Sequence, residues 1–229
     1  MGRSGTSFLA QFLETSGVFL DQDLKKGKFE HREAREINDT ICAQRFGARS
    51  GLPYGRLPDD EIEVGEPWPA KVATFVAQMD AKAEAAGARY WAVKDPRVTI
   101  FHRLWLPEID IVVGIFRDPF QVVSSFVRRG WVDGLGKRGT TLRYWTRFNR
   151  SLLEIADTAS PDHPVYVLDF NADMLAQLEN LCSGLGIPPN AEAFALYRET
   201  DNQEAGVASL AAFEAKKLHS RLVTARNLT

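Results

Sequence analysis

Three short apolar segments, interspersed with segments of helical periodicity, constrain the fold of this chain more than any other feature. Residues 90–93, 109–116 and 165–170 are rich in β-branched and aromatic side chains, which is typical of buried strands. Strands that alternate with helices predict a parallel sheet that helices cover on both faces. The length of 229 residues suits one such domain. We therefore expect a single α/β domain, residues 1–229, with three αβα layers around a central parallel sheet.

Hydrophobic periodicity predicts the helices. Four apolar residues line each of the first two helices: Phe8, Leu9, Phe12 and Leu13, and then Ala34, Ile37, Ile41 and Cys42. Further helices are expected near residues 69–86, 119–129, 140–159 and 172–185. Residues 47–69 are rich in Gly and Pro and predict a long loop. Such a loop in a compact domain is more often functional than idle, so it is a candidate lid or acceptor-binding loop.

Composition excludes several classes of protein. Hydrophobic residues make up 45% of the chain and charged residues 25%, which excludes disordered and fibrous proteins. Two cysteines, Cys42 and Cys182, form neither a disulfide framework nor a zinc pattern and are expected to be small buried residues. No apolar run approaches the roughly 20 residues that span a bilayer, and the N-terminus shows no signal-peptide pattern. We therefore expect a cytoplasmic protein without a membrane span or a bound metal.

Positive charge is concentrated in one part of the sequence. Residues 117–150 contain eight Lys or Arg against two Asp, a net charge of +6 in a chain whose total is −2. The rest therefore carries −8, which favours a small anionic ligand or an acidic glycan over a polyanion such as nucleic acid. Arg143, Arg147 and Arg150 would share one helical stripe, and a solvated helix face is the alternative interpretation for these three.

The sequence GRSGTS stands immediately before the first predicted helix. Backbone N–H groups and the positive helix end would converge there on an anion, so the segment is a candidate phosphate-binding loop of a P-loop-type nucleotide-binding fold. It differs from the loop of nucleoside triphosphatases, because its glycines are only three positions apart and Arg precedes the second one. An ordinary capped helix start is the alternative. The candidate residues are Gly2, Arg3, Ser4, Gly5, Thr6 and Ser7.

A phosphate-binding loop normally follows a buried central strand. Here Met1 stands directly before the loop, so that strand is missing from the sequence. We therefore expect the natural coding sequence to extend upstream and to encode a short strand rich in Val and Ile. A stop codon directly before Met1 would contradict this expectation.

A second candidate anion site lies at the end of the strand predicted at residues 109–116. Arg117 follows this strand directly, and ligands of parallel sheets bind at such strand ends. Ser125 comes eight residues later, about two turns into the next helix, where it can face the same anion. A planar guanidinium donates two parallel hydrogen bonds to a phosphate. The alternatives are a surface ion pair for Arg117 and a helix-filling role for Ser125.

In these residues the chain resembles the sulfotransferases that use 3′-phosphoadenosine 5′-phosphosulfate (PAPS), and it looks most similar to bacterial, carbohydrate-type members. The resemblance covers most of the chain: GRSGTS, Arg117 with Ser125, and residues 27–31, 91–97 and 165–170. It implies that the loop grips the 5′-phosphosulfate, while Arg117 and Ser125 grip the 3′-phosphate. The implied reaction moves a sulfuryl group from PAPS to a hydroxyl or amine of a small-molecule or glycan acceptor.

The resemblance also indicates catalytic residues, although the sequence departs from the family pattern. Arg3 stands where many cytosolic members carry Lys, and a fixed cation there stabilises the bridging oxygen without proton transfer. Lys94 is expected beside the sulfuryl group, but the Lys-x-His of the steroid and phenol enzymes is replaced by Lys-Asp-Pro-Arg. Glu30 is therefore the first candidate for the base, followed by His31 and Asp95. Their alternatives are solvated residues at a helix start and, for Asp95, a turn cap.

Two other functions fit parts of the pattern. In a phosphate-loop kinase, Asp95 or Asp169 at a strand end would hold Mg²⁺, although the longer loop with its Lys is lacking. A nucleotide-binding protein without turnover would keep the same fold. Magnesium dependence separates the kinase from the sulfotransferase, and turnover separates either enzyme from a binding protein.

Overall fold

The computed structural model of the protein describes residues 3–21, 29–47, 57, 62–132, 134–197 and 210–225. The chain is mostly helical, with a small sheet of two parallel strands, β1 (Val112–Phe116) and β2 (Val165–Asp169). Val112 lies opposite Val165, and Phe116 lies opposite Asp169. The predicted α/β class with a parallel sheet is therefore confirmed.

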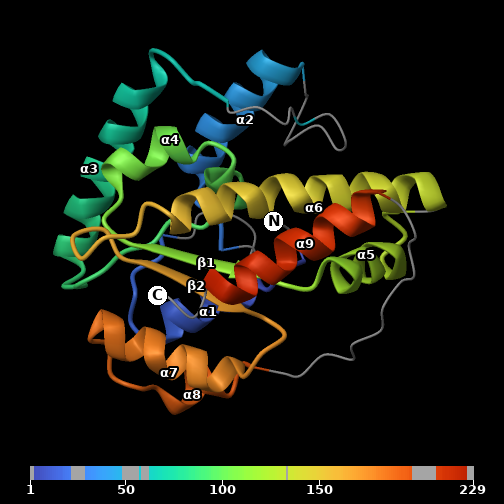
Figure 1. Ribbon diagram of the computed structural model, residues 1–229. Helices are drawn as coiled ribbons and strands as arrows, with labels where there is room; N and C mark the ends of the chain where they lie inside the picture. The colour runs from blue at the N-terminus through green and yellow to red at the C-terminus, as the bar shows by residue number, and fades with distance from the viewer. Residues whose placement is uncertain are drawn as a thin grey trace.

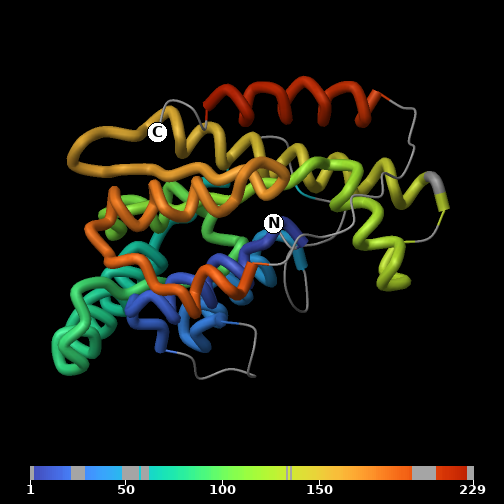
Figure 2. The backbone as a smooth tube through the Cα atoms, turned by 90° about the horizontal axis from the view of Figure 1, so that it is seen from below, coloured from blue at the N-terminus to red at the C-terminus, as the bar shows by residue number. Residues whose placement is uncertain are grey.

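Helices cover both faces of this sheet, as Figures 1 and 2 show. Along β2, Val165 and Val167 belong to one hydrophobic core, and Leu168 belongs to the other, because successive side chains of a strand point to opposite faces. The elements that pack on the first core include α2 (Arg32–Phe46), α3 (Trp68–Ala85), α4 (His102–Trp105), α5 (Pro119–Arg128), α6 (Leu135–Ala156) and α9 (Leu210–Ala225). Those on the second are α1 (Thr6–Thr15), α7 (Met174–Leu185) and α8 (Ala191–Phe194).

The approach of α6 to β1 explains the glycine inside the strand. A Cβ atom added to Gly114 would lie 2.4 Å from Cδ1 of Leu152 on α6. The helix therefore packs directly against the backbone of β1, as glycine within a strand often indicates. Two short 3₁₀ helices, η1 (Pro96–Thr99) and η2 (Leu106–Glu108), flank α4 on the way from residue 95 to β1.

Most predicted helices are confirmed with shifted ends. The helices expected at residues 69–86, 119–129, 140–159 and 172–185 correspond to α3, α5, α6 and α7, and the two earlier apolar faces belong to α1 and α2. Three helices, α4, α8 and α9, were not predicted from the sequence. Of the loop expected at residues 47–69, only residues 47, 57 and 62–69 lie within the described part, and α3 already begins at Trp68.

The strand predicted at residues 90–93 is wrong. The segment makes an isolated parallel bridge, in which Trp91 is paired with Phe19. Phe19 N–H donates to Tyr90 O and Ala92 N–H donates to Phe19 O, each at 2.9 Å. A strand requires a continuous ladder of backbone hydrogen bonds, and one bridge is too short for that. On the edge that faces away from Phe19, this segment pairs with no strand of the described residues.

Among the helices that the structure describes, none combines the length and the apolar character needed to cross a membrane.

Candidate functional site

The turn before α1 packs against the ends of both strands. Gly5, the N-cap of α1, has a φ of 95°, and a Cβ atom there would lie 2.5 Å from the Phe170 ring and 3.0 Å from Ile115. Arg3 has a φ of 73°, which is uncommon for a residue with a side chain and typical of binding turns. Alternating backbone conformations of this kind turn successive N–H groups toward one anion. No side chain of the described residues caps α1.

Arg117 is held at the strand end by the beginning of α5. The carboxylate of Asp118 caps that helix by accepting hydrogen bonds from the N–H groups of Phe120 at 2.8 Å and Gln121 at 3.0 Å. The Nε of Arg117 donates to Oε1 of Gln121 at 3.0 Å, and its Cζ lies 5.0 Å from the centre of the Phe170 ring. The side chain is thus fixed by neutral partners as it leaves β1.

The two predicted anion sites are brought together. The Nε of Arg3 donates a hydrogen bond to Oγ of Ser125 at 2.9 Å, although 122 positions separate them in the sequence. Ser125 is buried, and Arg117 is only 5% exposed. Arg3, Ser125 and Arg117 therefore belong to one site, which lies where β1 ends and where α1 and α5 begin.

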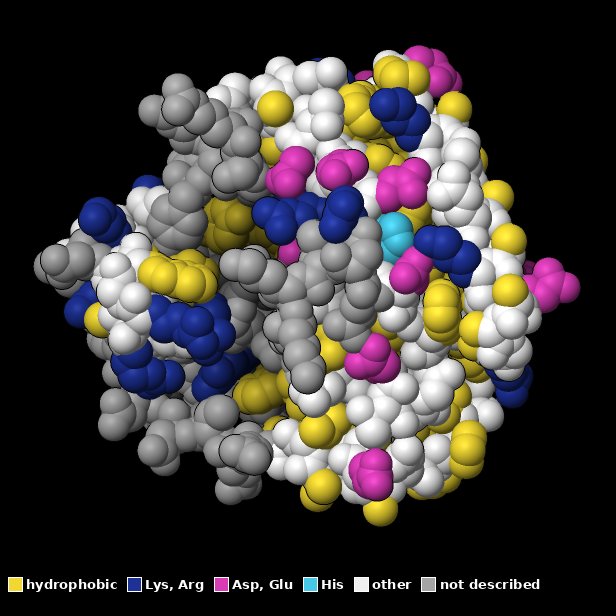
Figure 3. Space-filling model, turned by 180° about the vertical axis from the view of Figure 1, so that it is seen from behind, with side chains coloured by type: hydrophobic (Ala, Val, Ile, Leu, Met, Phe, Trp, Pro, Cys, Tyr) yellow, Lys and Arg dark blue, Asp and Glu magenta, His cyan; other side chains and the backbone are white. Residues whose placement is uncertain are grey.

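Four arginines give this site a strong positive potential: Arg3, Arg117, Arg128 and Arg129, which we call the arginine cluster. Burial lowers the pKa of Arg117 below its ordinary value, and the charges of Arg128 and Arg3 lower it further. Burial likewise lowers the pKa of Arg3, with further contributions from Arg129 and Arg128. Asp118 offsets part of the effect on Arg117. Figure 3 shows Lys and Arg side chains gathered beside a hollow on the face opposite to that of Figure 1.

Ser4 adds a buried hydroxyl to the turn. Its side chain is 1% exposed, and its Oγ has no hydrogen-bond partner among the described residues. Buried polar atoms nearly always have a partner, so a bound ligand or a water molecule is the expected one here. Thr6 is partly buried and Ser7 is exposed, whereas Gly2 lies outside the described residues.

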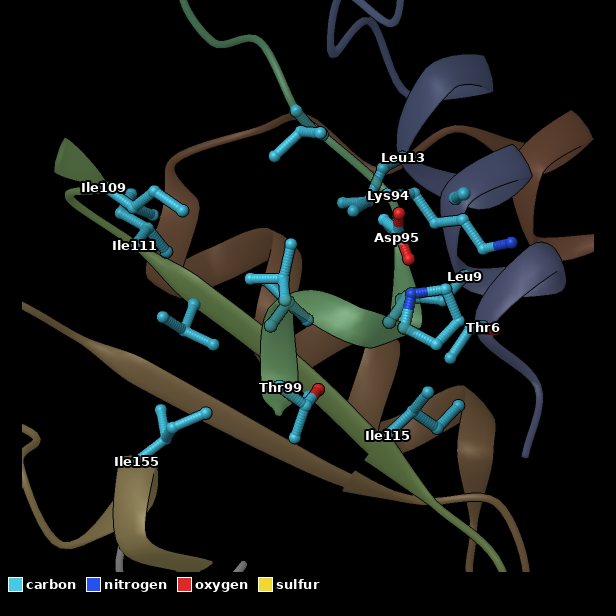
Figure 4. A pocket seen from close by; sticks show the side chains of 18 of the residues that line it. Thr6, Leu9, Leu13, Lys94, Asp95, Thr99, Ile109, Ile111, Ile115 and Ile155 are labelled. Carbon is cyan, nitrogen blue, oxygen red and sulfur yellow. The ribbon is translucent and has the colours of Figure 1, made fainter. Parts of the chain in front are cut away.

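Lys94 and Glu30 form a second part of the site. The Nζ of Lys94 lies 3.1 Å from Oε1 of Glu30, and both side chains are largely buried, at 14% and 20% exposure. In Figure 4 the Lys94 side chain extends toward α1, and Thr6 lies at the same end of the cavity that both residues line. The ammonium group of Lys94 therefore links Glu30 to the cavity that Thr6 of α1 also lines.

Two of the residues considered as the base have structural partners. His31 caps α2, because its Nδ1 accepts a hydrogen bond from Glu33 N–H at 3.2 Å, and its Nε2 lies 3.4 Å from Asp21. The carboxylate of Asp95 caps η1 and accepts hydrogen bonds from the Arg97 guanidinium and from Asn38 at 3.0 Å.

Burial on its own lowers the pKa of Arg97, but its hydrogen bonds and ion pairs with Asp95 and Asp39 raise that pKa above its usual value. Asp95 is therefore one partner of a buried ion pair. This agrees with the turn-cap alternative for Asp95, and it leaves Glu30 as the candidate base whose carboxylate faces Lys94.

Several residues of the site were missed in the sequence. Gln121 and Asn171 form a bridge between the two strand ends, since Nδ2 of Asn171 donates to Oε1 of Gln121 at 2.7 Å and Oδ1 of Asn171 accepts from Asp118 N–H at 2.8 Å. The sequence positions could have indicated both residues. Gln121 lies four positions after Arg117, about one helical turn, and Asn171 lies two positions after the end of β2. Arg128 and Arg129 were counted within the basic segment but were not assigned to the site.

The basic stripe predicted on α6 is divided. Arg147 is buried and bonds Ser151, whereas Arg143 is exposed and donates to Thr140 at 3.2 Å. Trp145 on the same helix is fully buried, and its Nε1 donates to the carbonyl of Arg117 at 2.9 Å. Helix α6 therefore holds the backbone of Arg117 in place at the end of β1 through this hydrogen bond.

Comparison with protein-family models, with curated protein sequences and with solved structures finds no match to this chain. Function is therefore inferred from the site itself. The site combines a cluster of arginines at the start of α1 and the end of β1 with a largely buried carboxylate–ammonium pair, Glu30 and Lys94. Such a site can bind a phosphorylated ligand and take a proton from a second substrate.

Proposed function

We propose that this protein is a sulfotransferase that moves a sulfuryl group from PAPS to an acceptor hydroxyl or amine on a carbohydrate. The observation that carries the proposal is the arginine cluster, in which cations from two separate parts of the chain meet at the end of β1. Arg3 comes from the turn before α1, while Arg117 comes from the strand end. A ligand with two anionic ends, such as a nucleotide phosphorylated at both the 3′ and 5′ positions, matches this arrangement.

In this proposal the segment GRSGTS, which leads into α1, binds the 5′-phosphosulfate, and Arg117 with Ser125 binds the 3′-phosphate. Ser125 already accepts a hydrogen bond from Arg3. A hydroxyl that accepts one bond keeps its own hydrogen, so Ser125 can still donate to a phosphate oxygen. The buried hydroxyl of Ser4 would find its partner in the same ligand.

The transfer follows from these positions. The acceptor oxygen attacks sulfur in line, the bond between sulfur and the bridging oxygen breaks, and 3′,5′-adenosine bisphosphate leaves with the electron pair. The proton of the acceptor passes to the carboxylate of Glu30. Arg3 and Lys94 stabilise negative charge on the sulfuryl oxygens and on the leaving phosphate. Residues of the chain supply every charge that this scheme requires, so no metal takes part in it.

The finer aspects of the fold and the setting belong to the same proposal. We assign the fold to the three-layer αβα, P-loop-containing nucleotide-binding type, which is supported by the helix-flanked parallel strands and by the turn before α1. Both cysteines are unpaired and buried, which supports a reducing, cytoplasmic location. The partners are a small-molecule or glycan acceptor, and nucleic acid is not expected to bind.

Calorimetry with 3′,5′-adenosine bisphosphate, combined with turnover of radiolabelled PAPS on mixed glycans, tests the function. A sulfotransferase should bind the bisphosphate and label an acceptor without added magnesium. Binding without labelling of any acceptor would indicate a nucleotide-binding protein. Magnesium-dependent transfer from ATP would indicate the kinase, in which Asp169 would have to hold the metal, because Asp95 is already paired with Arg97 and Asn38. Absence of bisphosphate binding would contradict the proposal.

A further inference from the structure

Trp131 is a large aromatic residue whose side chain lies mostly in solvent. It is 58% exposed, whereas Trp68, Trp105 and Trp145 are buried. It follows the end of α5, the helix that carries Ser125. In Figure 3, hydrophobic side chains adjoin the Lys and Arg side chains that gather beside the hollow. An exposed tryptophan next to a cationic site indicates a binding surface.

The end of α5 fixes the position of Trp131. Gly130 has a φ of 68° and its N–H donates to Val127 O at 2.9 Å, while Trp131 N–H donates to Phe126 O at 3.1 Å. These two bonds form a Schellman motif, which is completed by an apolar contact. The rings of Phe126 and Trp131 make that contact, with their centres 5.5 Å apart. A leucine would suffice for it, so the larger indole presents additional apolar surface that is already held in place.

Two exposed arginines, Arg128 and Arg129, precede this tryptophan in the chain. The Cζ atom of Arg129 lies 5.5 Å from the centre of the Trp131 ring, which is a cation–π contact. Among the described residues, neither arginine forms an ion pair with a carboxylate. An aromatic ring beside cations that have no counter-ion in the described fold suits a ligand that has both an apolar face and a negative charge.

The charges of the arginine cluster indicate which part of the site Trp131 adjoins. After burial, Arg129 makes the largest contribution to the lowered pKa of Arg3. The lowered pKa of Arg117 is due instead to burial and to the charges of Arg128 and Arg3. Trp131 and Arg129 therefore lie toward Arg3 rather than toward Arg117. In the proposed transfer Arg3 stabilises the sulfuryl end of PAPS, so a ligand at Trp131 would lie on the side from which the acceptor receives that group.

We propose that Trp131 and Arg129 bind a sugar ring of the acceptor, and that this acceptor is an acidic glycan. The inference rests on the proposed sulfuryl transfer, because it names the acceptor of that reaction. One face of a pyranose exposes C–H bonds, and these pack on the electron-rich face of the indole. The guanidinium of Arg129 forms charge-assisted hydrogen bonds with a carboxylate or sulfate group of the glycan. The tryptophan thus selects for a sugar, and the arginine selects for its charge.

The test uses a tetrasaccharide of alternating glucuronate and N-acetylglucosamine, with the uncharged tetrasaccharide of N-acetylglucosamine as its control. Calorimetry should show at least tenfold tighter binding of the acidic tetrasaccharide, and this ligand should protect Trp131 fluorescence from quenching by acrylamide. Trp131→Ala should weaken binding of the acidic tetrasaccharide at least tenfold, whereas Trp131→Phe should keep most of it. Arg129→Ala should remove the preference for the acidic tetrasaccharide, because the guanidinium recognises its carboxylates.

Leu175→Ala is the matched control, since it removes an exposed apolar side chain from α7, which packs on the other core. It should bind the acidic tetrasaccharide as wild type does. Equal binding by wild type and Trp131→Ala would overturn the inference. So would a loss of 3′,5′-adenosine bisphosphate affinity in Trp131→Ala, which would assign the ring to adenine.

Binding to phosphatidylserine vesicles that depends on Trp131, without binding of the tetrasaccharide, would likewise overturn the inference in favour of a membrane surface. None of these measurements requires turnover. If the bisphosphate binds and the acidic tetrasaccharide does not, only the acceptor inference fails. If the bisphosphate does not bind, the proposed sulfuryl transfer itself fails.

Discussion

Two buried arginines, Arg97 and Arg117, occupy opposite electrostatic environments. Arg97 is 9% exposed and lies between the carboxylates of Asp95 and Asp39, which raise its pKa despite burial. Arg117 is 5% exposed and has a neutral partner in Gln121, and burial and neighbouring arginines lower its pKa. The charge of Arg97 is neutralised within the fold. That of Arg117 adds to a positive cluster.

This difference distinguishes a structural cation from a functional one. A buried charge that has its counter-ion in the fold contributes to the native structure, and removing one partner leaves the other uncompensated. A cluster of like charges is tolerated where a ligand of opposite sign binds, and perturbed pKa values gather at such sites. On this basis we expect substitutions at Arg97 to affect stability and substitutions in the arginine cluster to affect ligand binding and turnover.

The largest expected effect is on stability. Arg97→Ala should lower the free energy of unfolding by about 3–5 kcal/mol, because Asp95 would remain buried without its cation. Arg117→Ala should lower it by less, because the lost hydrogen bond to Gln121 and the lost contact with Phe170 are partly offset by relief of repulsion within the cluster. Urea denaturation of the two variants measures both values. Equal losses in the two variants would show that the distinction between these arginines is wrong.

Arg3→Ala should reduce sulfuryl transfer on the order of 10² to 10³-fold, because it removes a fixed cation from the developing negative charge. Arg143→Ala is the matched control, since Arg143 is exposed on α6 and its guanidinium donates to the hydroxyl of Thr140. The control should keep wild-type turnover of radiolabelled PAPS. An Arg3→Ala enzyme as fast as wild type would refute the catalytic role of Arg3.

A smaller effect is expected on nucleotide affinity. Arg117→Ala should weaken binding of 3′,5′-adenosine bisphosphate by about 10 to 150-fold, which corresponds to roughly 1.5–3 kcal/mol for hydrogen bonds to a charged group. Adenosine 5′-monophosphate lacks the 3′-phosphate, so its affinity should change little. Calorimetry with both nucleotides separates the two cases, and a parallel loss for both would assign Arg117 to a different part of the ligand.

The smallest effect concerns His102, a buried imidazole. Unlike the guanidinium of an arginine, it can become neutral. Burial lowers the pKa of His102. The pKa of His102 in the folded protein therefore lies below the unfolded value of about 6.5. The stability that neutral His102 contributes is fully present above about pH 6.5 and is lost as the pH falls from there through the folded pKa. Unfolding free energies between about pH 7.5 and pH 5 should fall less in His102→Gln than in wild type. Identical profiles would exclude this contribution.

Local signals in the sequence predicted the elements that carry the arginine cluster. The apolar run before Arg117 and the proline at position 119 indicate a strand followed by a helix, and β1 and α5 have these positions. The glycine-containing turn before α1 was likewise evident. Helix α9 was missed because half of its buried face consists of alanines, Ala212 and Ala215 beside Leu218 and Leu222, which weakens the periodic apolar signal.

Contacts between residues that are distant in the sequence determined the features that local patterns did not predict. The segment at residues 90–93 has the composition of a strand, but a ladder depends on its neighbours, and the segment pairs only through Phe19 among the described residues. Asp95, a candidate base in the sequence, accepts hydrogen bonds from Asn38 and from Arg97, and only the first of these two partners is distant in the sequence. The contact between Arg3 and Ser125 spans 122 positions and follows from no local pattern, although the family resemblance implies that both residues bind one ligand.

The close approach of Gly5 to Phe170 and Ile115 has a practical consequence for protein engineers. One added methyl group at position 5 would push the turn away from the strand ends while leaving all four guanidinium charges in the chain. Position 5 thus offers a way to alter shape without altering charge. An inactive variant that keeps the native net charge and pI would be a better negative control in mixed-glycan assays than a variant that lacks one of the arginines.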